Sequence, residues 1–388
     1  MSNHTKSIFL KSWAVLLAAG LLVSCQPKVR KVKIAVALPL TGDIASLGQG
    51  LKRAIEMAVA EHNAAKADHP VEVVSFDDRS DPKEAVSVAN RIVSDPGFIG
   101  VIGHFNSGCS IPASRVYAQN NLPMISPASS NPDLTLQQLS PQWTYTKCIF
   151  RVNTTDNVQG GVGADFIVQT LGIKKIAVIH DKTSYGQGVA EEFRKEAEVK
   201  GAKVLAFEGL QVGDRDFRSL LTRVKALSPD ALYFGGMFSE GGILVRQARD
   251  IGFKGAILLP EANYDESFLR VAGPAAEGSY VTFLGSPPEL LDSAKDFVAR
   301  YRQRYPYFEL KSYDHYGYEV AEILLDAVDA VGPDRDKIIT YIRNVKHDGV
   351  LGQTAFDEKG DTLNKTITLF QVKGGKFVPV PAPDQPKP

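Results

Sequence analysis

The sequence predicts an α/β protein with two similar lobes, each built on a parallel β-sheet that helices cover on both faces. Three observations lead to this prediction. Apolar runs without polar alternation, typical of strands buried on both faces, alternate with segments of helical periodicity. This alternation occurs twice along the chain, and short motifs recur in corresponding places. The length of 388 residues also exceeds what one small core usually supports.

The first repeat alternates strands and helices. The expected elements are strands at 32–40 (VKIAVALPL), 71–78 and 98–102 and helices at 46–65, 81–95 and 111–119. This order is typical of a parallel sheet with helices on both faces. The stretch GHFNSGCS follows the third strand, so small polar residues stand where a strand gives way to a helix.

The second repeat restates the same order. Its expected elements are strands at 174–180, 202–210 and 230–236 and helices at 184–197 and 214–227. SLGQG at 46–50 matches SYGQG at 184–188, and VIGHFNSG aligns with YFGGMFSEG so that Ser107 stands opposite Ser239. The spacing is far above that of solenoid repeats and therefore indicates a duplicated domain.

The last third of the chain adds further elements. They are strands at 256–260 and 278–283, helices near 289–304, 314–331 and 334–345, and a β-meander at 354–380 with turns at DEKGD and KGGK. We expect one lobe at 30–155 plus 284–365, the other at 156–283 plus 366–380, and a Pro-rich tail at 381–388. Repeated crossings between lobes would form a hinge.

Residues 1–25 are expected to be a signal peptide. A basic start with Lys6 and Lys11 precedes the apolar stretch 13–23, which is too short to span a bilayer as a stable anchor. Leu-Val-Ser-Cys ending at Cys25 resembles the lipobox of bacterial lipoproteins, in which the cysteine is lipidated; an incidental cysteine is the alternative. Because Gln26 follows, a Gram-negative lipoprotein of this kind would lie in the outer membrane. We expect a lipid-anchored protein of the periplasm or cell envelope.

Composition and motifs exclude several classes of function. Lys and Arg balance Asp and Glu at 44 each, so nothing favours nucleic acid. No nucleophile elbow, phosphate-binding loop, complete dinucleotide fingerprint, or zinc spacing occurs, so we expect no enzyme, cofactor or metal site. Cys109 and Cys148 either form a disulfide or are two free buried thiols.

The loops that follow the strands contain the candidate ligand-binding residues, since ligands bind beyond the carboxyl ends of parallel strands. Ser107 at a helix start offers a hydroxyl and a backbone N–H to a carboxylate, or serves as an N-cap. Ala128 and Ser130 lie in a small-residue loop whose carbonyl could accept from an ammonium, or in an ordinary turn. Glu261 directly follows an apolar strand and requires a cation unless it forms a surface ion pair. Tyr185 covers a pocket or packs in the core.

Together these residues describe a small zwitterion, with its carboxylate on the first lobe and its ammonium shared with Glu261 on the second. Several stretches then resemble the leucine/isoleucine/valine-binding protein family, the type I substrate-binding proteins of branched-chain amino acid ABC transporters. They are FDDRSDPKEAVSVANRIVSD, VIGHFNSGCSIPAS, MISPASSNP, IAVIHDKTSYGQG, YFGGMFSEGGILVRQAR, PEANYD and FDEKGD. The resemblance implies the type I periplasmic-binding-protein fold, two Rossmann-like lobes joined by three crossover strands.

The resemblance also implies roles for single residues. The ligand carboxylate would fall to Ser107 and the Ser130 loop, and the ammonium to the Ala128 carbonyl, the Ser130 hydroxyl and Glu261. Tyr185 would cover the ligand. The implied protein is a monomeric receptor that binds an apolar amino acid and delivers it to a membrane permease, touching the membrane only through its lipid anchor.

This chain departs from the family pattern around the ligand side chain. Leu47 and Met237 stand where the pattern usually has tyrosines, and Phe105 and Tyr313 could line the same pocket. Leucine, isoleucine and valine remain candidates, and a larger aliphatic or aromatic amino acid is open. A sensory module of the same fold, or a binder of an amide or urea, is the alternative. The latter would not need an ammonium partner at Glu261.

Overall fold

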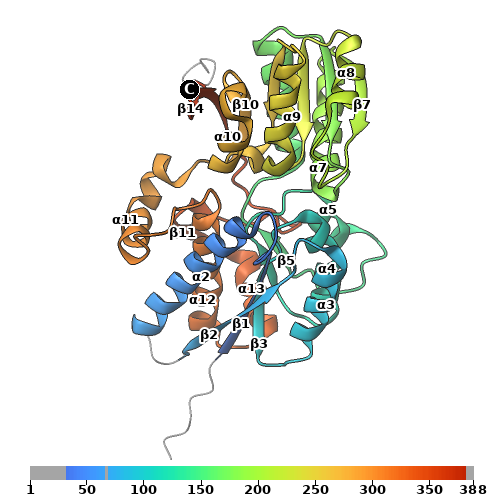
Figure 1. Ribbon diagram of the computed structural model, residues 1–388. Coiled ribbons are helices and arrows are strands. Elements are labelled where there is room, and N and C mark those ends of the chain that lie inside the picture. The colour runs from blue at the N-terminus through green and yellow to red at the C-terminus, as the bar shows by residue number, and fades with distance from the viewer. Residues whose placement is uncertain (1–31, 66–68, 382–388) are drawn as a thin grey trace, which may run out of the picture. The chain divides into compact units, whose positions relative to one another are not determined.

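Two β-sheets organise the protein, for which a computed structural model describes residues 32–65 and 69–381 (Figure 1). Sheet A has the order β2-β1-β3-β4-β5 and is parallel throughout. Its strands are β1 (Val32–Leu38), β2 (Val71–Asp77), β3 (Phe98–Gly103), β4 (Met124–Ser126) and β5 (Ile149–Arg151). The predicted α/β class and the parallel sheet of the first repeat are therefore confirmed.

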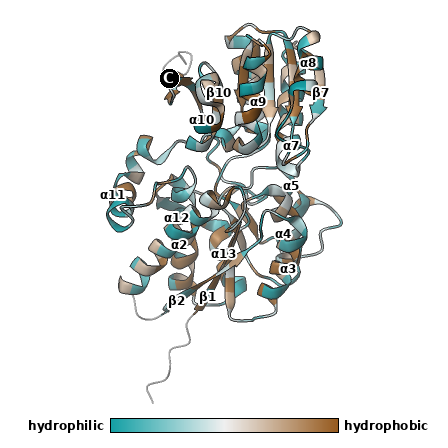
Figure 2. Ribbon diagram, viewed as in Figure 1, coloured by the Kyte–Doolittle hydropathy of each residue, from teal (hydrophilic) through white to brown (hydrophobic). Residues whose placement is uncertain are grey.

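Helices bury both faces of sheet A. One face packs against α2 (Ala45–Ala65) and α12 (Asp314–Val331), with α13 (Arg335–Asn344) beside α12; the other packs against α3 (Pro82–Val93) and α4 (Ser107–Gln119). Along β1, Ile34 and Val36 face the first pair of helices, while Ala35 and Ala37 face the second. All four are fully buried, which explains why β1 lacks polar alternation (Figure 2).

Sheet B is mixed, whereas the sequence predicted a second purely parallel sheet. Its order is β14-β13-β10-β9-β8-β6-β7. The parallel strands are β6 (Lys175–His180), β7 (Lys203–Gly209), β8 (Ala231–Gly235), β9 (Ala256–Leu259) and β10 (Tyr280–Leu284). The hairpin of β13 (Ile367–Lys373) and β14 (Lys376–Pro379) adds antiparallel to β10, turning at the predicted KGGK.

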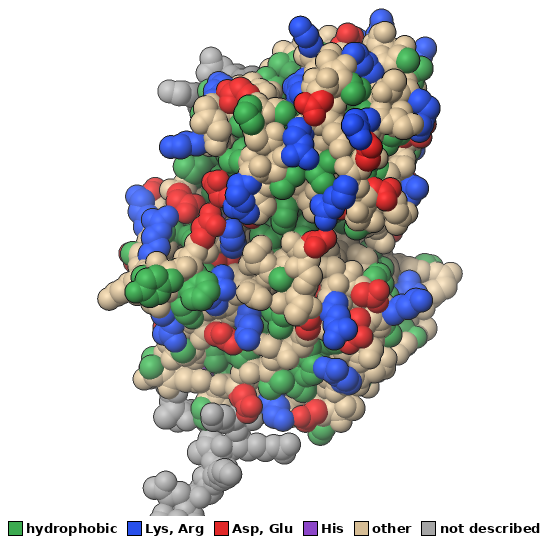
Figure 3. All heavy atoms as spheres, viewed as in Figure 1, with side chains coloured by type: hydrophobic (Ala, Val, Ile, Leu, Met, Phe, Trp, Pro, Cys, Tyr) green, Lys and Arg blue, Asp and Glu red, His purple; other side chains and the backbone are tan. Residues whose placement is uncertain are grey.

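Sheet B is also covered on both faces. One face packs against α6 (Asp156–Ala164) and its π-helical continuation Asp165–Thr170, together with α7 (Ser184–Val199). The other packs against α8 (Arg218–Ala226), α9 (Phe238–Asp250) and α10 (Glu266–Ala272). Of these helices, α7 and α8 begin at or close to the predicted positions 184 and 214, and the other three were not predicted. On the face seen in Figure 3, basic and acidic side chains are interspersed, as expected from their equal numbers.

The matching motifs SLGQG and SYGQG occupy equivalent places at the starts of α2 and α7. A Cβ added to Gly48 would lie 2.1 Å from the Pro39 carbonyl oxygen, and one added to Gly186 would lie 2.2 Å from Asp181 Oδ1. Each glycine therefore lets a helix start directly against the end of the preceding strand. This close approach is the physical reason for the repeated glycine.

The chain passes between the sheets three times: after β5, after β10 and before β13. The second passage leads through α11 (Lys295–Arg304) to α12 and α13. The predicted meander at 354–380 is wrong in its first part, because the residues around the DEKGD turn form only isolated β-bridges and no strand of a sheet. One bridge pairs Asp361 with Arg151, and their side chains form a buried ion pair at 2.6 Å.

The cysteines of the described residues, Cys109 and Cys148, are free and buried. This finding decides between the two alternatives that the sequence left open. None of the helices in 32–65 and 69–381 is long and apolar enough to cross a membrane. The predicted signal peptide, its Cys25 and most of the Pro-rich tail lie outside the described residues.

Candidate functional site

A small pocket, with a cavity volume of about 10 Å³, lies beyond the carboxyl ends of strands from both sheets. Its lining residues are Phe105, Asn106, Ser107, Ala128, Tyr185, Met237, Glu261, Ala262 and Tyr313. The structure thus brings most of the expected site residues together. Leu47 instead packs in the core, and Ser130 lies behind the lining, close to Asp156.

The start of α4 forms one wall of the pocket. Ser107 is the first helical residue and Asn106 is the N-cap, so the N-cap interpretation of Ser107 is wrong. The Ser107 hydroxyl accepts from the Asn131 N–H at 3.2 Å. The first N–H groups of a helix have no partner within it and attract an anion. Gly103 ends β3 with φ of 145° and a Cβ there would lie 2.2 Å from the Ala37 carbonyl, so only glycine fits this turn.

Glu261 lines the other side of the pocket, and a second buried carboxylate, Asp156, lies near it behind the lining. Glu261 follows β9 at the start of the 3₁₀ turn Glu261–Asn263 and is 2% exposed. Its Oε2 has no hydrogen-bond partner, while Oε1 lies 3.4 Å from the Tyr313 hydroxyl. Asp156 at the start of α6 is fully buried, and neither of its carboxylate oxygens has a partner. Buried carboxylates without partners are costly and indicate a place for a cation.

The electrostatics of this pair support the same conclusion. Burial raises the pKa of Glu261 to about 6, although the nearby side chains of Gln159 and Tyr185 oppose the shift. Burial and the nearby Glu261 carboxylate raise the pKa of Asp156 well above its usual range. Each effect disfavours the charged form. A cation between the two groups would restore both charges and remove their repulsion.

Further polar groups around the carboxylates also lack partners. They are the hydroxyls of Ser130 and Tyr185. The Ala128 carbonyl accepts from the Asn153 side-chain amide at 3.1 Å, and its second lone pair stays available. Buried polar groups are nearly always hydrogen-bonded, so a cluster of unpartnered ones indicates a polar ligand.

Apolar side chains line the rest of the pocket. Phe105 and Tyr313 pack edge to face with ring centroids 5.1 Å apart, and both are buried. Met237 is the N-cap of α9, a helix that packs on sheet B. The pocket therefore combines a site for an anion, a site for a cation and an apolar wall.

Sequence reasoning missed Asp156, Asn106 and Ala262. Asp156 occurs in TTDN, shortly after β5, a strand that was not predicted from the sequence. The rule that ligands bind at the carboxyl ends of parallel strands applies there as well. Acidic residues are common at helix starts because they interact favourably with the helix dipole, so the sequence alone does not distinguish Asp156 as a ligand-binding residue.

Comparisons with known proteins agree with the geometry. The sequence pattern of the periplasmic binding protein family matches residues 31–376. The "Leu/Ile/Val-binding protein homolog 2" of Brucella abortus is 36% identical over 349 residues, covering 89% of this chain and 91% of that protein. The "amino acid binding protein" of Pseudomonas aeruginosa is 35% identical and covers 95% of this chain and 97% of that protein.

Solved structures extend the likeness to three dimensions. The leucine-binding protein LivK of Thermotoga maritima has a TM-score of 0.82 at 31% identity, covering 90% of this chain and 98% of that one. LivJ of Streptococcus pneumoniae, a branched-chain amino acid transporter substrate-binding protein in complex with isoleucine, has a TM-score of 0.78 at 26% identity, covering 89% and 97%. Membership in the matched family implies a location outside the cytoplasm. The chain belongs to the periplasmic binding protein family.

Proposed function

We propose that the protein binds an apolar α-amino acid in this pocket and delivers it to the permease of an ABC transporter. The observation that carries this proposal is the pair of buried carboxylates, Glu261 opposite the start of α4 and Asp156 near it, three of whose four oxygens lack a hydrogen-bond partner. A zwitterionic ligand provides a carboxylate for the start of α4 and an ammonium for the two buried carboxylates. The names of the relatives and the isoleucine bound to LivJ make leucine, isoleucine and valine the first candidates.

Each part of the ligand has a proposed partner. The carboxylate lies against Ser107 and the first N–H groups of α4. The ammonium meets Glu261 and Asp156, together with the Ala128 carbonyl and the Ser130 hydroxyl. Phe105, Met237 and Tyr313 enclose the side chain, and Tyr185 covers the ligand.

Binding would favour a closed arrangement of two lobes, 30–155 plus 284–365 and 156–283 plus 366–380. A ligand that contacts both lobes binds the closed state better than the open one and shifts the population toward it. The three passages of the chain between the sheets would form the hinge. An amide or urea ligand is disfavoured, since neither would provide a charge for the carboxylate pair.

We further propose that the protein is a monomeric receptor without enzymatic activity, anchored through lipid on Cys25 in the outer membrane. Support comes from the lipobox-like residues 22–25 and from Gln26 after the cysteine. Exchange of Cys25 for serine should then release the protein from the membrane fraction into the soluble fraction. Retention of the Cys25→Ser variant in the outer membrane would contradict this anchor.

A thermal-shift screen against the common amino acids, urea and short amides tests the proposed function. A ligand that binds only the folded state stabilises it by about 2.7 kcal/mol at 100 times its Kd. We expect a raised melting temperature with one or more of leucine, isoleucine, valine and larger apolar amino acids. A response to urea or an amide alone would contradict the proposed function.

A further inference from the structure

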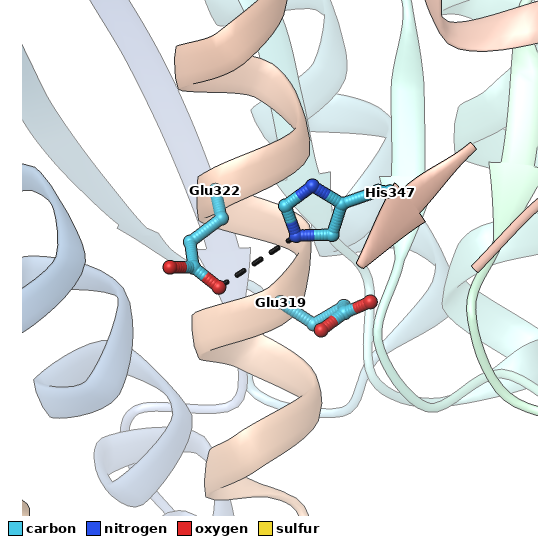
Figure 4. A group of neighbouring side chains, drawn as sticks. All are labelled: Glu319, Glu322 and His347. Carbon is cyan, nitrogen blue, oxygen red and sulfur yellow. Dashed lines mark ion pairs between the residues drawn. The ribbon is translucent and has the colours of Figure 1, made fainter. Parts of the chain in front are cut away.

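A second cluster of acidic and imidazole groups lies away from the pocket, between α12 and the hairpin of β11 (His347–Gly349) and β12 (Gly352–Thr354). Glu319 and Glu322 are three residues apart on α12, so their side chains share one face of the helix. His347 begins β11 and points toward both (Figure 4). The cluster thus joins two elements that are separate in the sequence.

The candidate ligand atoms of this cluster converge. One atom from each of Glu319, Glu322 and His347 lies within 4.8 Å of the others. Glu322 Oε2 is 3.7 Å from His347 Nε2 (Figure 4). A Cβ added to Gly349 would lie 2.2 Å from Glu319 Oε2 and 2.5 Å from His347 Nε2. The glycine therefore leaves free the space toward which both atoms point.

The orientation of His347 gives separate evidence for a bound cation. Its Nδ1 lies 3.1 Å from Asp326 Oδ2, while its Nε2 has no hydrogen-bond partner although the side chain is only 10% exposed. A buried ring nitrogen without a hydrogen bond is unusual, and the nearest carboxylate oxygen, Glu322 Oε2, forms only a long ion pair with it at 3.7 Å. Metal-bound histidines typically donate their other N–H to a carboxylate, which fixes the ring and directs the free nitrogen to the ion.

The carboxylates are held in place and reachable from solvent, as a cation site requires. Glu319 is fully buried, and its oxygens accept from the Leu351 N–H at 3.1 Å and from the Thr354 hydroxyl. Glu322 and Asp326 are 31% and 45% exposed, so an ion and water can enter from solvent. Within 32–65 and 69–381, no lysine or arginine forms an ion pair with any of these three carboxylates.

We propose that Glu319, Glu322 and His347 bind a divalent first-row transition-metal ion, with Zn²⁺ the first candidate and Asp326 orienting the imidazole. One imidazole and two carboxylates, with water in the remaining position, suit Zn²⁺. Ca²⁺ and Mg²⁺ prefer oxygen ligands alone. The ion would fasten the β11–β12 hairpin to α12, a site independent of the proposed amino-acid pocket.

Calorimetric titration of the chelator-treated protein with Zn²⁺ tests this site. We expect one ion per chain, weakened at least tenfold by Glu322→Gln or His347→Gln. Loss of a carboxylate that orients a ligating histidine typically costs about 10–100-fold in affinity, so Asp326→Asn should weaken binding by that factor. The matched control is His62→Gln, because His62 also pairs with a carboxylate of α12, Asp329, at 3.1 Å but belongs to no such cluster. Its Zn²⁺ affinity should equal that of the parent.

Two outcomes would overturn the site: absence of stoichiometric Zn²⁺ binding, or binding that Glu322→Gln leaves unchanged. The first would make the cluster an ion-pair network of His347 with its carboxylates. Because Glu322 is partly exposed, its variant should fold even if His347→Gln does not. Visible absorption of bound Co²⁺ gives a second readout, and it should change in Glu322→Gln and not in His62→Gln.

Discussion

Replacement of Glu261 by glutamine tests the charge that the proposed ligand needs. Glutamine keeps the shape of the side chain and an oxygen acceptor but removes the negative charge beside the ammonium. Breaking a buried, hydrogen-bonded charge pair costs about 2–5 kcal/mol. Glu261 is 2% exposed, so bulk water cannot solvate the ammonium in its place. The carboxylate of Asp156 remains nearby and partly compensates for the lost charge. We therefore expect the lower part of this range, about 2–3 kcal/mol, which raises Kd about 30- to 150-fold.

Calorimetric titration with L-leucine, or with the amino acid that the thermal screen selects, measures this change. Glu240→Gln is the matched control, because Glu240 is as buried as Glu261 but does not line the pocket. The control should bind the ligand with the affinity of the parent. If Glu261→Gln also binds like the parent, Glu261 does not face the ammonium, and the reasoning from unpartnered carboxylates is refuted.

Three further predictions concern pH, stability and thiol reactivity. Burial raises the pKa of Glu261 to about 6, and the ammonium of the ligand favours the charged form of the carboxylate. The affinity for the amino acid should therefore be full above pH 6 and fall as the pH decreases through that value. A calorimetric profile that stays flat from pH 8 to 5 would contradict this. Asp361→Asn leaves the buried guanidinium of Arg151 without its partner and should cost about 3–5 kcal/mol in urea unfolding, whereas a cost below about 1 kcal/mol would show the pair to be dispensable. Burial raises the pKa of the Cys148 thiol to about 12 and that of the Cys109 thiol further. Peptide mapping after treatment with iodoacetamide at pH 8 should therefore find both cysteines unlabelled until the protein is unfolded. Rapid labelling of the native protein would place them at the surface.

Strands β1 and β3 of sheet A could be predicted from the sequence because both of their faces are buried, which makes each a nearly unbroken apolar run. The hairpin of β13 and β14 was predicted as part of a β-meander and assigned to the second lobe, but its antiparallel pairing with β10 was not predicted. The KGGK turn is a local signal, but the pairing of β13 with β10 depends on contacts distant in the sequence. The turn at DEKGD was predicted correctly as a turn, but its partner Arg151 lies 210 residues away, so no local pattern indicates that it returns to sheet A.

The candidate site shows the same division between local and distant signals. Ser107, Ala128, Tyr185 and Glu261 stand where strands end, and the structure gathers all four around one pocket. Asp156 was missed because an acid at a helix start has an ordinary explanation. Only the fold brings its carboxylate near Glu261. The metal site likewise has no motif, since its histidine comes from a strand 25 residues after the second glutamate.

The central claim is that the pocket recognises both charges of an α-amino acid. Calorimetric titration of the ligand-free protein with L-leucine, 4-methylpentanoate and 3-methylbutylamine tests it most directly, since the three share one side chain. A site built for a polar group rejects an analogue that lacks it by up to about 10⁴–10⁵-fold. We predict that L-leucine binds at one molecule per chain and that both analogues bind at least about 100-fold more weakly. Equal affinity for L-leucine and 4-methylpentanoate would contradict the account, because the carboxylates of Glu261 and Asp156 would then have no role in recognition.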